Sequence, residues 1–249
     1  MSDVFSRFAP FIQEYIYRCK WEELREIQVL AAQAIFDTDE NLLLSSGTAS
    51  GKTEAAFLPV LTQLWENPSA SVGVLYLSPL KALINDQFER LEGLLEEAAI
   101  PVTKWHGDAS AAAKKRVMKR PQGIIQTTPE SLESMLMHNS SGAYRLFSDL
   151  RFVIIDEMHY FMDNDRGLQL LCLLERLARL IGYHPRRIGL SATLGDCTSA
   201  VQWLNTDSGR DCIVPKCHEK GRSLRLSVRF FPIKEKIPNS DSKILLQNY

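Results

Sequence analysis

The sequence of 249 residues lacks a long hydrophobic run. No stretch approaches the roughly 18 apolar residues by which a membrane-spanning helix is recognised. Residues 1–6 also lack the basic segment and the apolar core that open a secretory signal peptide. These absences predict a protein that has no membrane partner and is soluble in the cytoplasm.

Cysteine and excess charge are also scarce. The nearest approach to a zinc site is Cys212, Cys217 and His218, and a fourth ligand is missing. Reduced thiols of a cytosolic protein are the simpler interpretation. The 29 basic and 30 acidic side chains give a formal net charge of −1. This balance neither indicates nor excludes a nucleic-acid partner, because a local basic face disappears in the sum.

What the sequence does contain is an alternation of short apolar runs with longer helical patterns. The runs have the length and composition of buried strands, and they cover residues 41–44, 72–77, 100–105, 123–126, 152–155 and 187–190. The expected helices cover residues 3–20, 21–36, the segment from 52, 82–98, a basic segment at 114–120, 130–137 and 167–181. Such alternation predicts an α/β fold in which a mostly parallel sheet carries helices on both faces. Ligands of these sheets bind at the carboxyl ends of the strands.

Residues 45–54 join the first apolar run to a helix and contain a glycine-bearing turn that ends in Gly-Lys-Thr. Strand, turn and helix in this order predict a phosphate-binding loop. Gly47 and Gly51 let backbone N–H groups approach phosphate oxygens, and the helix start adds its dipole. Lys52 is expected to reach the β- and γ-phosphates of ATP, and the Thr53 hydroxyl to hold Mg²⁺. The expected nucleotide-binding residues are Gly47, Thr48, Ala49, Ser50, Gly51, Lys52, Thr53 and Glu54. Ser46 departs from the Gly or Ala that usually opens this motif.

Two acidic residues follow the most apolar run, at 152–155. Asp156 is expected to hold Mg²⁺, and Glu157 to orient and deprotonate the attacking water. A turn that merely ends the strand would also explain the pair. The position of the pair after a phosphate loop favours the ATPase interpretation, with Lys52, Asp156 and Glu157 as its catalytic residues.

Gln28 lies on an expected helix shortly before the phosphate loop. Its amide can both donate and accept, which reading the edge of an adenine requires. A solvated side chain is the alternative interpretation, and the sequence leaves both open.

These residues, in this order, resemble the motifs of superfamily 2 helicases of the DEAD/DEAH-box type over roughly residues 20–230. Residues 156–161, with Arg166 and Gly167 after them, look closest to the Lhr-like branch. The resemblance implies the RecA-like form of the P-loop NTPase fold and assigns further roles. It implies nucleic-acid binding by Ser78, Pro79, Leu80, Lys81, His106, Gly107, Asp108, Thr127, Thr128, Pro129 and Glu130. It implies that nucleotide state is coupled to nucleic-acid binding by His159, Ser191, Ala192 and Thr193.

The residues expected at the nucleic-acid face agree with that resemblance. Ser78, Thr127 and Thr128 bring short hydroxyl side chains to strand ends, and Gly107 leaves backbone N–H groups open. Such groups contact phosphates without reading sequence, as tracking along single-stranded DNA or RNA requires. The basic segment 114–120 could add a salt-sensitive contact, although a solvated helix face is the preferred interpretation.

The sequence shows only one of the two lobes that these helicases carry. Nothing after Thr193 resembles the second lobe, whose arginine stabilises the transferring phosphate. Residues 1–21 are expected to form an N-terminal helical extension, residues 22–205 the RecA-like ATP-binding domain 1, and residues 206–249 a strand and linker toward a second domain. That second RecA-like lobe would lie in cis beyond Tyr249 or on a partner chain.

Three classes of function remain open at this point. The first is the ATP-binding lobe of an ATP-dependent nucleic-acid helicase or translocase. The second is a stand-alone adaptor that binds nucleic acid in response to nucleotide and needs a partner for hydrolysis. The third is another phosphate-loop enzyme, such as a small-molecule kinase or a transporter ATPase, which would have no need for Thr127, Thr128 and Ser191. The sequence decides neither DNA against RNA nor the direction of movement.

Overall fold

The computed structural model describes residues 3–47, 50–80, 93–107, 109–192, 194 and 196–217. These residues belong to one compact unit that ends at Cys217. The strand and linker expected after residue 217, and most of the helix expected at 82–98, lie outside the described residues.

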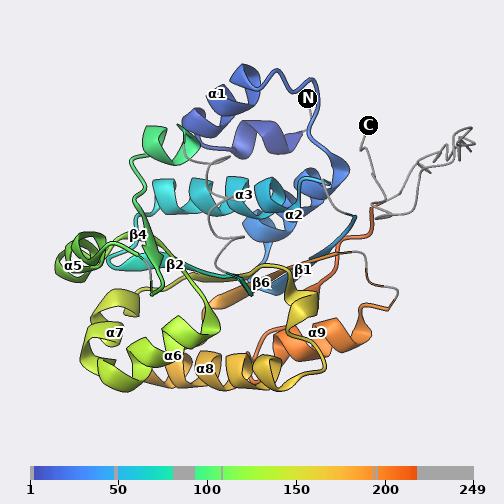
Figure 1. Ribbon diagram of the computed structural model, residues 1–249. Coiled ribbons are helices and arrows are strands. Elements are labelled where there is room, and N and C mark those ends of the chain that lie inside the picture. The colour runs from blue at the N-terminus through green and yellow to red at the C-terminus, as the bar shows by residue number, and fades with distance from the viewer. Residues whose placement is uncertain are drawn as a thin grey trace, which may run out of the picture. The chain divides into compact units, whose positions relative to one another are not determined.

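A central sheet organises this unit (Figure 1). In the described residues it has seven strands in the order β3-β4-β2-β5-β6-β1-β7. The strands are β1 (Asn41–Ser45), β2 (Val72–Leu77), β3 (Val102–Trp105), β4 (Gly123–Thr127), β5 (Phe152–Ile155), β6 (Arg186–Ser191) and β7 (Cys212–Ile213). Every neighbouring pair is parallel. The predicted α/β fold with a parallel sheet is confirmed.

Helices cover both faces of the sheet (Figure 1). One face carries the 3₁₀ helix η1 (Asp3–Arg7), α1 (Pro10–Arg18), α2 (Glu26–Asp37) and α3 (Lys52–Glu66). The other carries α6 (Pro129–His138), α7 (Ser140–Phe147), α8 (Asp165–Ile181) and α9 (Thr198–Asn205). Helix α5 (Ala111–Lys119) packs beside β3, at the edge of the sheet.

The two layers follow from the alternation of side chains along each strand. In β1, Leu42 and Leu44 join the hydrophobic cluster under α2 and α3, whereas Leu43 joins the cluster on the other face. In β2, Tyr76 and Leu77 separate in the same way. Because both faces are covered, the strands are apolar without interruption rather than at every second residue.

Several boundaries differ from those expected. The helix expected from Trp21 begins at Glu26, because Arg25 has extended backbone angles and its N–H donates to the Gln28 side chain at 2.9 Å. The helix expected at 3–20 is divided into η1 and α1, and Pro10 occupies the first turn of α1. Helices α7 and α9 and strand β7 were not expected.

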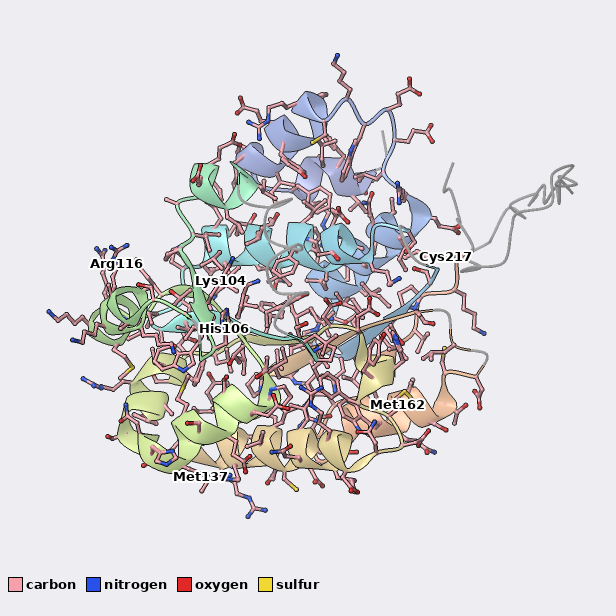
Figure 2. The ribbon with its side chains drawn as sticks, in the orientation of Figure 1. Lys104, His106, Arg116, Met137, Met162 and Cys217 are labelled. Atoms are coloured by element: carbon pink, nitrogen blue, oxygen red, sulfur yellow. The ribbon has the colours of Figure 1, made fainter. Side chains whose placement is uncertain are left out.

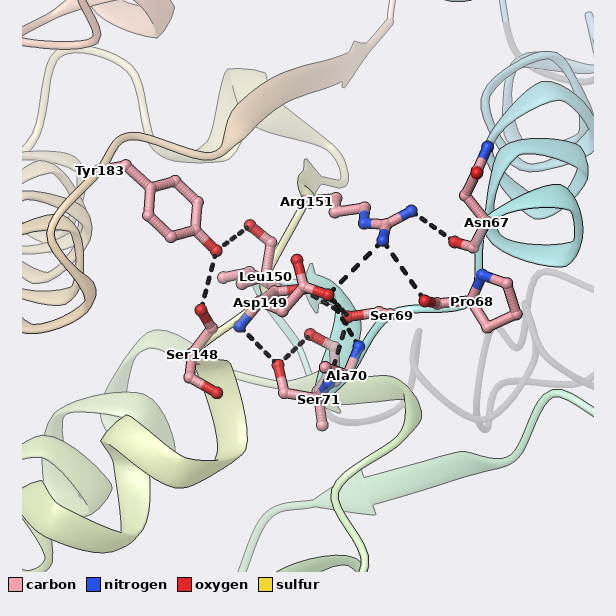
Figure 3. A network of polar contacts seen from close by, with 11 residues as sticks. Asn67, Pro68, Ser69, Ala70, Ser71, Ser148, Asp149, Leu150, Arg151 and Tyr183 are labelled. Atoms are coloured by element: carbon pink, nitrogen blue, oxygen red, sulfur yellow. Dashed lines mark hydrogen bonds and ion pairs between the residues drawn. The ribbon is translucent and has the colours of Figure 1, made fainter.

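A polar network ties together the loops that enter β2 and β5 (Figure 3). The Asp149 carboxylate accepts hydrogen bonds from the Ala70 N–H at 2.7 Å and the Ser69 hydroxyl at 3.1 Å. The Asp149 N–H donates to the Ser71 hydroxyl at 2.8 Å. Arg151 donates to the backbone carbonyl of Asn67. This network lies at the amino ends of the strands, so it fixes the edge opposite the polar motifs.

Candidate nucleotide and nucleic-acid site

The polar motifs gather at the carboxyl ends of the strands, because parallel strands end at the same edge of a sheet. The phosphate loop follows β1, and Asp156 follows β5. Strand β6 lies between β1 and β5 and ends at Ser191. The loop, the acidic pair and the Ser191 segment therefore come from three adjacent strands.

The phosphate loop closes onto its own lysine. Lys52 Nζ donates to the carbonyl oxygens of Ser46 at 2.6 Å and Gly47 at 2.9 Å. The hydroxyls of Ser46 and Ser50 lie 2.6 Å apart. Gly51 has a φ of +85°, a left-handed conformation that favours glycine, and α3 begins directly after it. Two residues of the predicted site, Thr48 and Ala49, lie outside the described residues.

Gln28 lies against this loop. Its side chain is buried, and a Cβ atom added to Gly51 would lie 2.9 Å from its amide nitrogen. The amide oxygen already accepts from the Arg25 N–H at 2.9 Å. Gln28 is only 2% exposed, so it is not the solvated side chain that the sequence left open as an alternative. Its role in reading adenine stays a prediction.

Asp156 is held from two sides. The Tyr76 hydroxyl donates to Oδ2, and the Glu157 N–H donates to Oδ1 at 3.0 Å. Burial raises the pKa of Asp156 above its ordinary value, and the Tyr76 hydrogen bond acts in the opposite direction. Burial, together with Asp156, raises the pKa of Tyr76 well above its ordinary value, so its hydroxyl stays a donor.

Glu157 leaves the strand in an unusual conformation. Its φ is +45°, in the left-handed region that a residue with a side chain rarely occupies. Strained backbone of this kind costs of order 1–3 kcal/mol and is concentrated at functional sites. The turn gives the two neighbouring carboxylates different surroundings, since Asp156 is buried whereas the Glu157 side chain is 28% exposed.

Lys52 of the loop interacts electrostatically with Asp156 and Glu157. Burial lowers the pKa of Lys52, and the carboxylates of Glu157 and Asp156 oppose that shift. An anionic phosphate at the loop would therefore meet a cation that neighbouring carboxylates help to keep protonated.

His159 connects the acidic pair to the end of β6. Its Nδ1 lies 3.4 Å from Glu157 Oε2, 3.4 Å from the Ser191 hydroxyl and 3.4 Å from the Ala192 nitrogen. The Ser45 hydroxyl, at the end of β1, donates to the Ala192 carbonyl at 3.2 Å. The contacts of these side chains link all three strand ends. Thr193, the last of the predicted coupling residues, lies outside the described residues.

The hydroxyls expected at the nucleic-acid face are engaged inside the protein. Thr127 Oγ1 donates to the Trp105 carbonyl at 2.6 Å, and Ser78 Oγ donates to the Leu80 carbonyl at 3.3 Å. Ser78 and Thr127 are fully buried, and Thr128 is 4% exposed. In this conformation the hydroxyls shape their loops, so free phosphate-binding donors would have to come from the backbone. Lys81 and Asp108 lie outside the described residues.

Arg166 joins two of the expected nucleic-acid segments, a role that the sequence motifs did not indicate. Its Nη2 donates to the Pro79 carbonyl at 2.7 Å, and its Nε pairs with Glu130 Oε1 at 2.7 Å. The next residue must be glycine, because a Cβ atom at Gly167 would lie 1.6 Å from the Phe161 carbonyl oxygen. In the sequence, Arg166 and Gly167 stood out only through their likeness to the Lhr-like branch.

The basic segment forms α5, as expected, and lies on the flank next to β3. Lys114 Nζ donates to the His106 carbonyl at 2.6 Å and sits 5.6 Å from the centre of the Trp105 ring. Arg116 extends outward from the helix (Figure 2). His106 itself is buried, and Gly107 is exposed. At least one cation of this segment thus has a structural role.

Comparison with known proteins decides the family. The model of the DEAD/DEAH box helicase family matches residues 25–200, which is more than half of the chain. The chain belongs to the DEAD/DEAH box helicase family. The resemblance carried by its motifs is confirmed.

Relatives of this helicase lobe include proteins of the Lhr branch. The ATP-dependent helicase Lhr-Core of Methanothermobacter thermautotrophicus is 33% identical over 231 residues, which cover 85% of this chain and 26% of the relative. The chain spans about a quarter of the length of the curated relatives it matches. The similarity to Lhr-Core helicases confirms the Lhr-like branch that residues 156–167 indicated.

Solved helicase structures share the fold. The helicase Lhr of Mycobacterium smegmatis, solved with single-stranded DNA and AMP-PNP, has a TM-score of 0.73 and 30% identity over 86% of this chain and 28% of that chain. The DUF1998 helicase MrfA, solved with DNA and AMPPNP, has a TM-score of 0.75 and 26% identity over 87% of this chain and 30% of that chain. The RecA-like form of the fold is confirmed.

Two features are absent from the described residues. Among them, no three His, Cys, Asp or Glu side chains gather where they could hold a metal ion together. No helix of the described chain is both long and apolar enough to cross a membrane. Asp156, Glu157 and the Thr53 hydroxyl carry oxygen atoms, the kind of ligand that suits Mg²⁺ bound together with a nucleotide.

Proposed function

We propose that this chain is the ATP-binding lobe of an ATP-dependent helicase or translocase that moves on single-stranded nucleic acid. The observation that carries the proposal is the linkage of three strand ends. His159 contacts Glu157 and Ser191, while Ser45 connects the phosphate-loop strand to Ala192. Through these contacts, a change from one bound nucleotide to another can alter the position of the segment after β6.

The nucleotide part of the proposal assigns each residue a task. Lys52 leaves the carbonyls of Ser46 and Gly47 and binds the β- and γ-phosphates. Thr53 and Asp156 would hold Mg²⁺ through oxygen, and the metal would neutralise phosphate charge when bound. Glu157 orients and deprotonates the attacking water. Gln28 lies beside the loop, where its amide reads the adenine.

The nucleic-acid part rests on the loops after β2, β3 and β4. Residues 78–81, 106–108 and 127–130 would meet the phosphates of one strand, mainly through backbone groups. The relatives are named ATP-dependent helicases, and the helicases Lhr and MrfA were solved with DNA. Single-stranded DNA is therefore the first ligand to test, with RNA beside it.

Hydrolysis by this lobe alone is expected to be slow. The second lobe would supply an arginine, and arginine fingers contribute roughly 10³–10⁵ to the rate where they have been measured. The chain covers about a quarter of the length of its relatives, which leaves room for such a lobe in the whole proteins.

The test is Mg²⁺-dependent ATP binding and turnover by the chain, with and without single-stranded DNA or RNA at low salt. Lys52→Ala is the blank, since it removes the cation that binds phosphate. We expect nucleotide binding that the blank lacks, together with slow turnover. An absence of nucleotide binding would refute the proposal. Rapid turnover that nucleic acid stimulates would show that the second lobe is dispensable.

A further inference from the structure

Tyr76 is a tyrosine in a position where packing alone would favour phenylalanine. It is fully buried in β2, and its ring lies 5.7 Å from that of Phe57 within an apolar cluster. A buried hydroxyl destabilises the fold unless it is hydrogen-bonded, so phenylalanine would fill the same space without that requirement. The Tyr76 hydroxyl must therefore have a role other than packing in the core.

The hydroxyl donates to Asp156, the carboxylate expected to hold Mg²⁺. The strands set this contact, because β2 and β5 are neighbours with Tyr76 opposite Ile154. Asp156 lies two residues beyond Ile154, and its N–H donates to the Leu77 carbonyl at 2.8 Å. The main chain and the tyrosine hydroxyl thus fix the acid from the same strand.

Both carboxylate oxygens are then restrained. Tyr76 donates to Oδ2, and the Glu157 N–H donates to Oδ1 at 3.0 Å. Each oxygen has a second lone pair, which stays available to a metal-bound water or to the metal. A carboxylate held at two points cannot rotate freely about its terminal bond.

We propose that Tyr76 is a positioning residue for the Mg²⁺-binding carboxylate of Asp156. Groups that hydrogen-bond to metal ligands orient them, and their loss typically lowers metal affinity or activity about 10- to 100-fold. The inference deepens the proposed function and rests on it, since it assumes that Asp156 meets Mg²⁺ and nucleotide. It adds a residue that the sequence motifs do not include and that does not touch the ligand.

A purely structural role would give a different result. If the hydroxyl only satisfies the buried acid, its removal weakens the fold and leaves the Mg²⁺ dependence of nucleotide binding unchanged. If it positions the acid, binding of nucleotide without metal is kept and the gain that Mg²⁺ provides is reduced.

The experiment compares Tyr76→Phe with the unmodified chain by fluorescence titration of a labelled ADP, once in EDTA and once across a series of Mg²⁺ concentrations. Tyr183→Phe is the matched control. It removes the same atom, a hydroxyl that donates to the Leu150 carbonyl at 3.0 Å at the opposite edge of the sheet (Figure 3). Circular dichroism and thermal unfolding establish that all three proteins are folded.

For Tyr76→Phe we expect the affinity for labelled ADP in EDTA to be unchanged. The Mg²⁺ concentration that gives half of the gain in ADP affinity should rise about tenfold, at the lower end of the range for lost partners of metal ligands. Tyr183→Phe should keep the Mg²⁺ dependence of the unmodified chain. Combined with Asp156→Asn, the tyrosine substitution should have little further effect, because it acts through that acid.

Two outcomes would overturn the inference alone. One is an Mg²⁺ dependence of Tyr76→Phe equal to that of the unmodified chain. The other is an equal loss of affinity with and without Mg²⁺, which would point to a distorted loop. If the unmodified chain binds no nucleotide, the proposed function fails and the inference fails with it.

Discussion

At the scale of single residues, the site divides into a part that is local in sequence and a part that is not. The phosphate loop is contiguous from 45 to 54, and its glycines, lysine and threonine stand together, so sequence alone could predict it. The partner of Asp156 is Tyr76, 80 positions away, and no periodicity connects them. The same is true of Arg166 and Pro79, which are 87 positions apart. Contacts of this kind depend on strand order, which motifs do not encode.

The left-handed glycine of the loop yields a first prediction. Gly51→Ala combines backbone strain with a Cβ atom 2.9 Å from the Gln28 amide nitrogen. We expect a loss of about 1–2 kcal/mol in the free energy of unfolding from the strain and a strong loss of nucleotide affinity from the displaced Gln28. Urea unfolding and nucleotide titration measure the two effects.

Gly182→Ala is the control for this substitution. Gly182 has a φ of +89° at the end of α8, and a Cβ atom there would meet nothing within 4 Å. It should lose similar stability and keep its nucleotide affinity. Equal affinity losses in both variants would show that general destabilisation, and not the contact with Gln28, is the cause.

Arg166 provides a second prediction at this scale. Arg166→Ala removes the bonds to the Pro79 carbonyl and to Glu130. Because these bonds join the loops after β2 and β4, we expect single-stranded DNA to bind about tenfold more weakly, as the loss of about 1.4 kcal/mol of loop positioning implies. Nucleotide affinity should be unchanged. Fluorescence anisotropy with labelled DNA is the measurement.

Arg179→Ala is the matched control on the same helix, since Arg179 is exposed and pairs only locally with Glu175 in the described contacts. It should leave DNA binding as it is. A similar decrease in both variants would indicate that loss of one positive charge, rather than the link between loops, weakens binding.

At the scale of elements, the strands were the most predictable part. Runs such as 72–77 and 152–155 are apolar throughout because both of their faces are covered, and that pattern survives in the sequence. Strand β7 has two residues, too few for any pattern, and it exists because it pairs with β1. Helix α7 depends on Asn139, whose side chain accepts from the Gly142 N–H at 3.0 Å. A cap of this kind is a local signal, separate from the apolar patterns that predict the longer helices.

The loops at the amino ends of β2 and β5 give a third prediction, on pH. Burial acts to raise the pKa of Asp149, but hydrogen bonds from Ala70 and Ser69 and the charge of Arg151 lower it below its ordinary value. A lowered folded-state pKa stabilises the protein above the unfolded value of about 3.9, and this stability is lost as the pH falls toward the folded value. Acid should therefore weaken the Figure 3 network.

Asp149→Asn tests this dependence. The variant should be less stable than the unmodified chain at neutral pH by about 1 kcal/mol, as for a lost hydrogen bond to a charged group that is partly exposed. The difference should shrink below about pH 4, where Asp149 of the unfolded chain takes up a proton while the folded carboxylate still resists protonation. Urea unfolding at several pH values measures it. A difference that stays constant with pH would contradict the assigned role of the charge.

At the scale of the whole molecule, the N-terminal elements are part of the domain and more than an appendage. Phe8, Ile12 and Ile16 are buried in the same cluster as the strands and α3. The Ala9 N–H donates to the Thr62 hydroxyl of α3 at 3.2 Å. The sequence indicated a helix here, but its amphipathic pattern could not show which surface it covers.

Removing residues 1–21 is the last prediction. Burial of a large apolar side chain contributes about 1.5–3 kcal/mol, so loss of Phe8, Ile12 and Ile16 would remove roughly 5–9 kcal/mol. That is comparable to the whole stability of a domain, about 5–15 kcal/mol. We expect the truncated chain to lose cooperative thermal unfolding and to bind a hydrophobic dye. Ile12→Ala should show a graded loss of about 2–5 kcal/mol. A truncated chain that unfolds cooperatively at the original temperature would show instead that the sheet and α3 are stable without this cover.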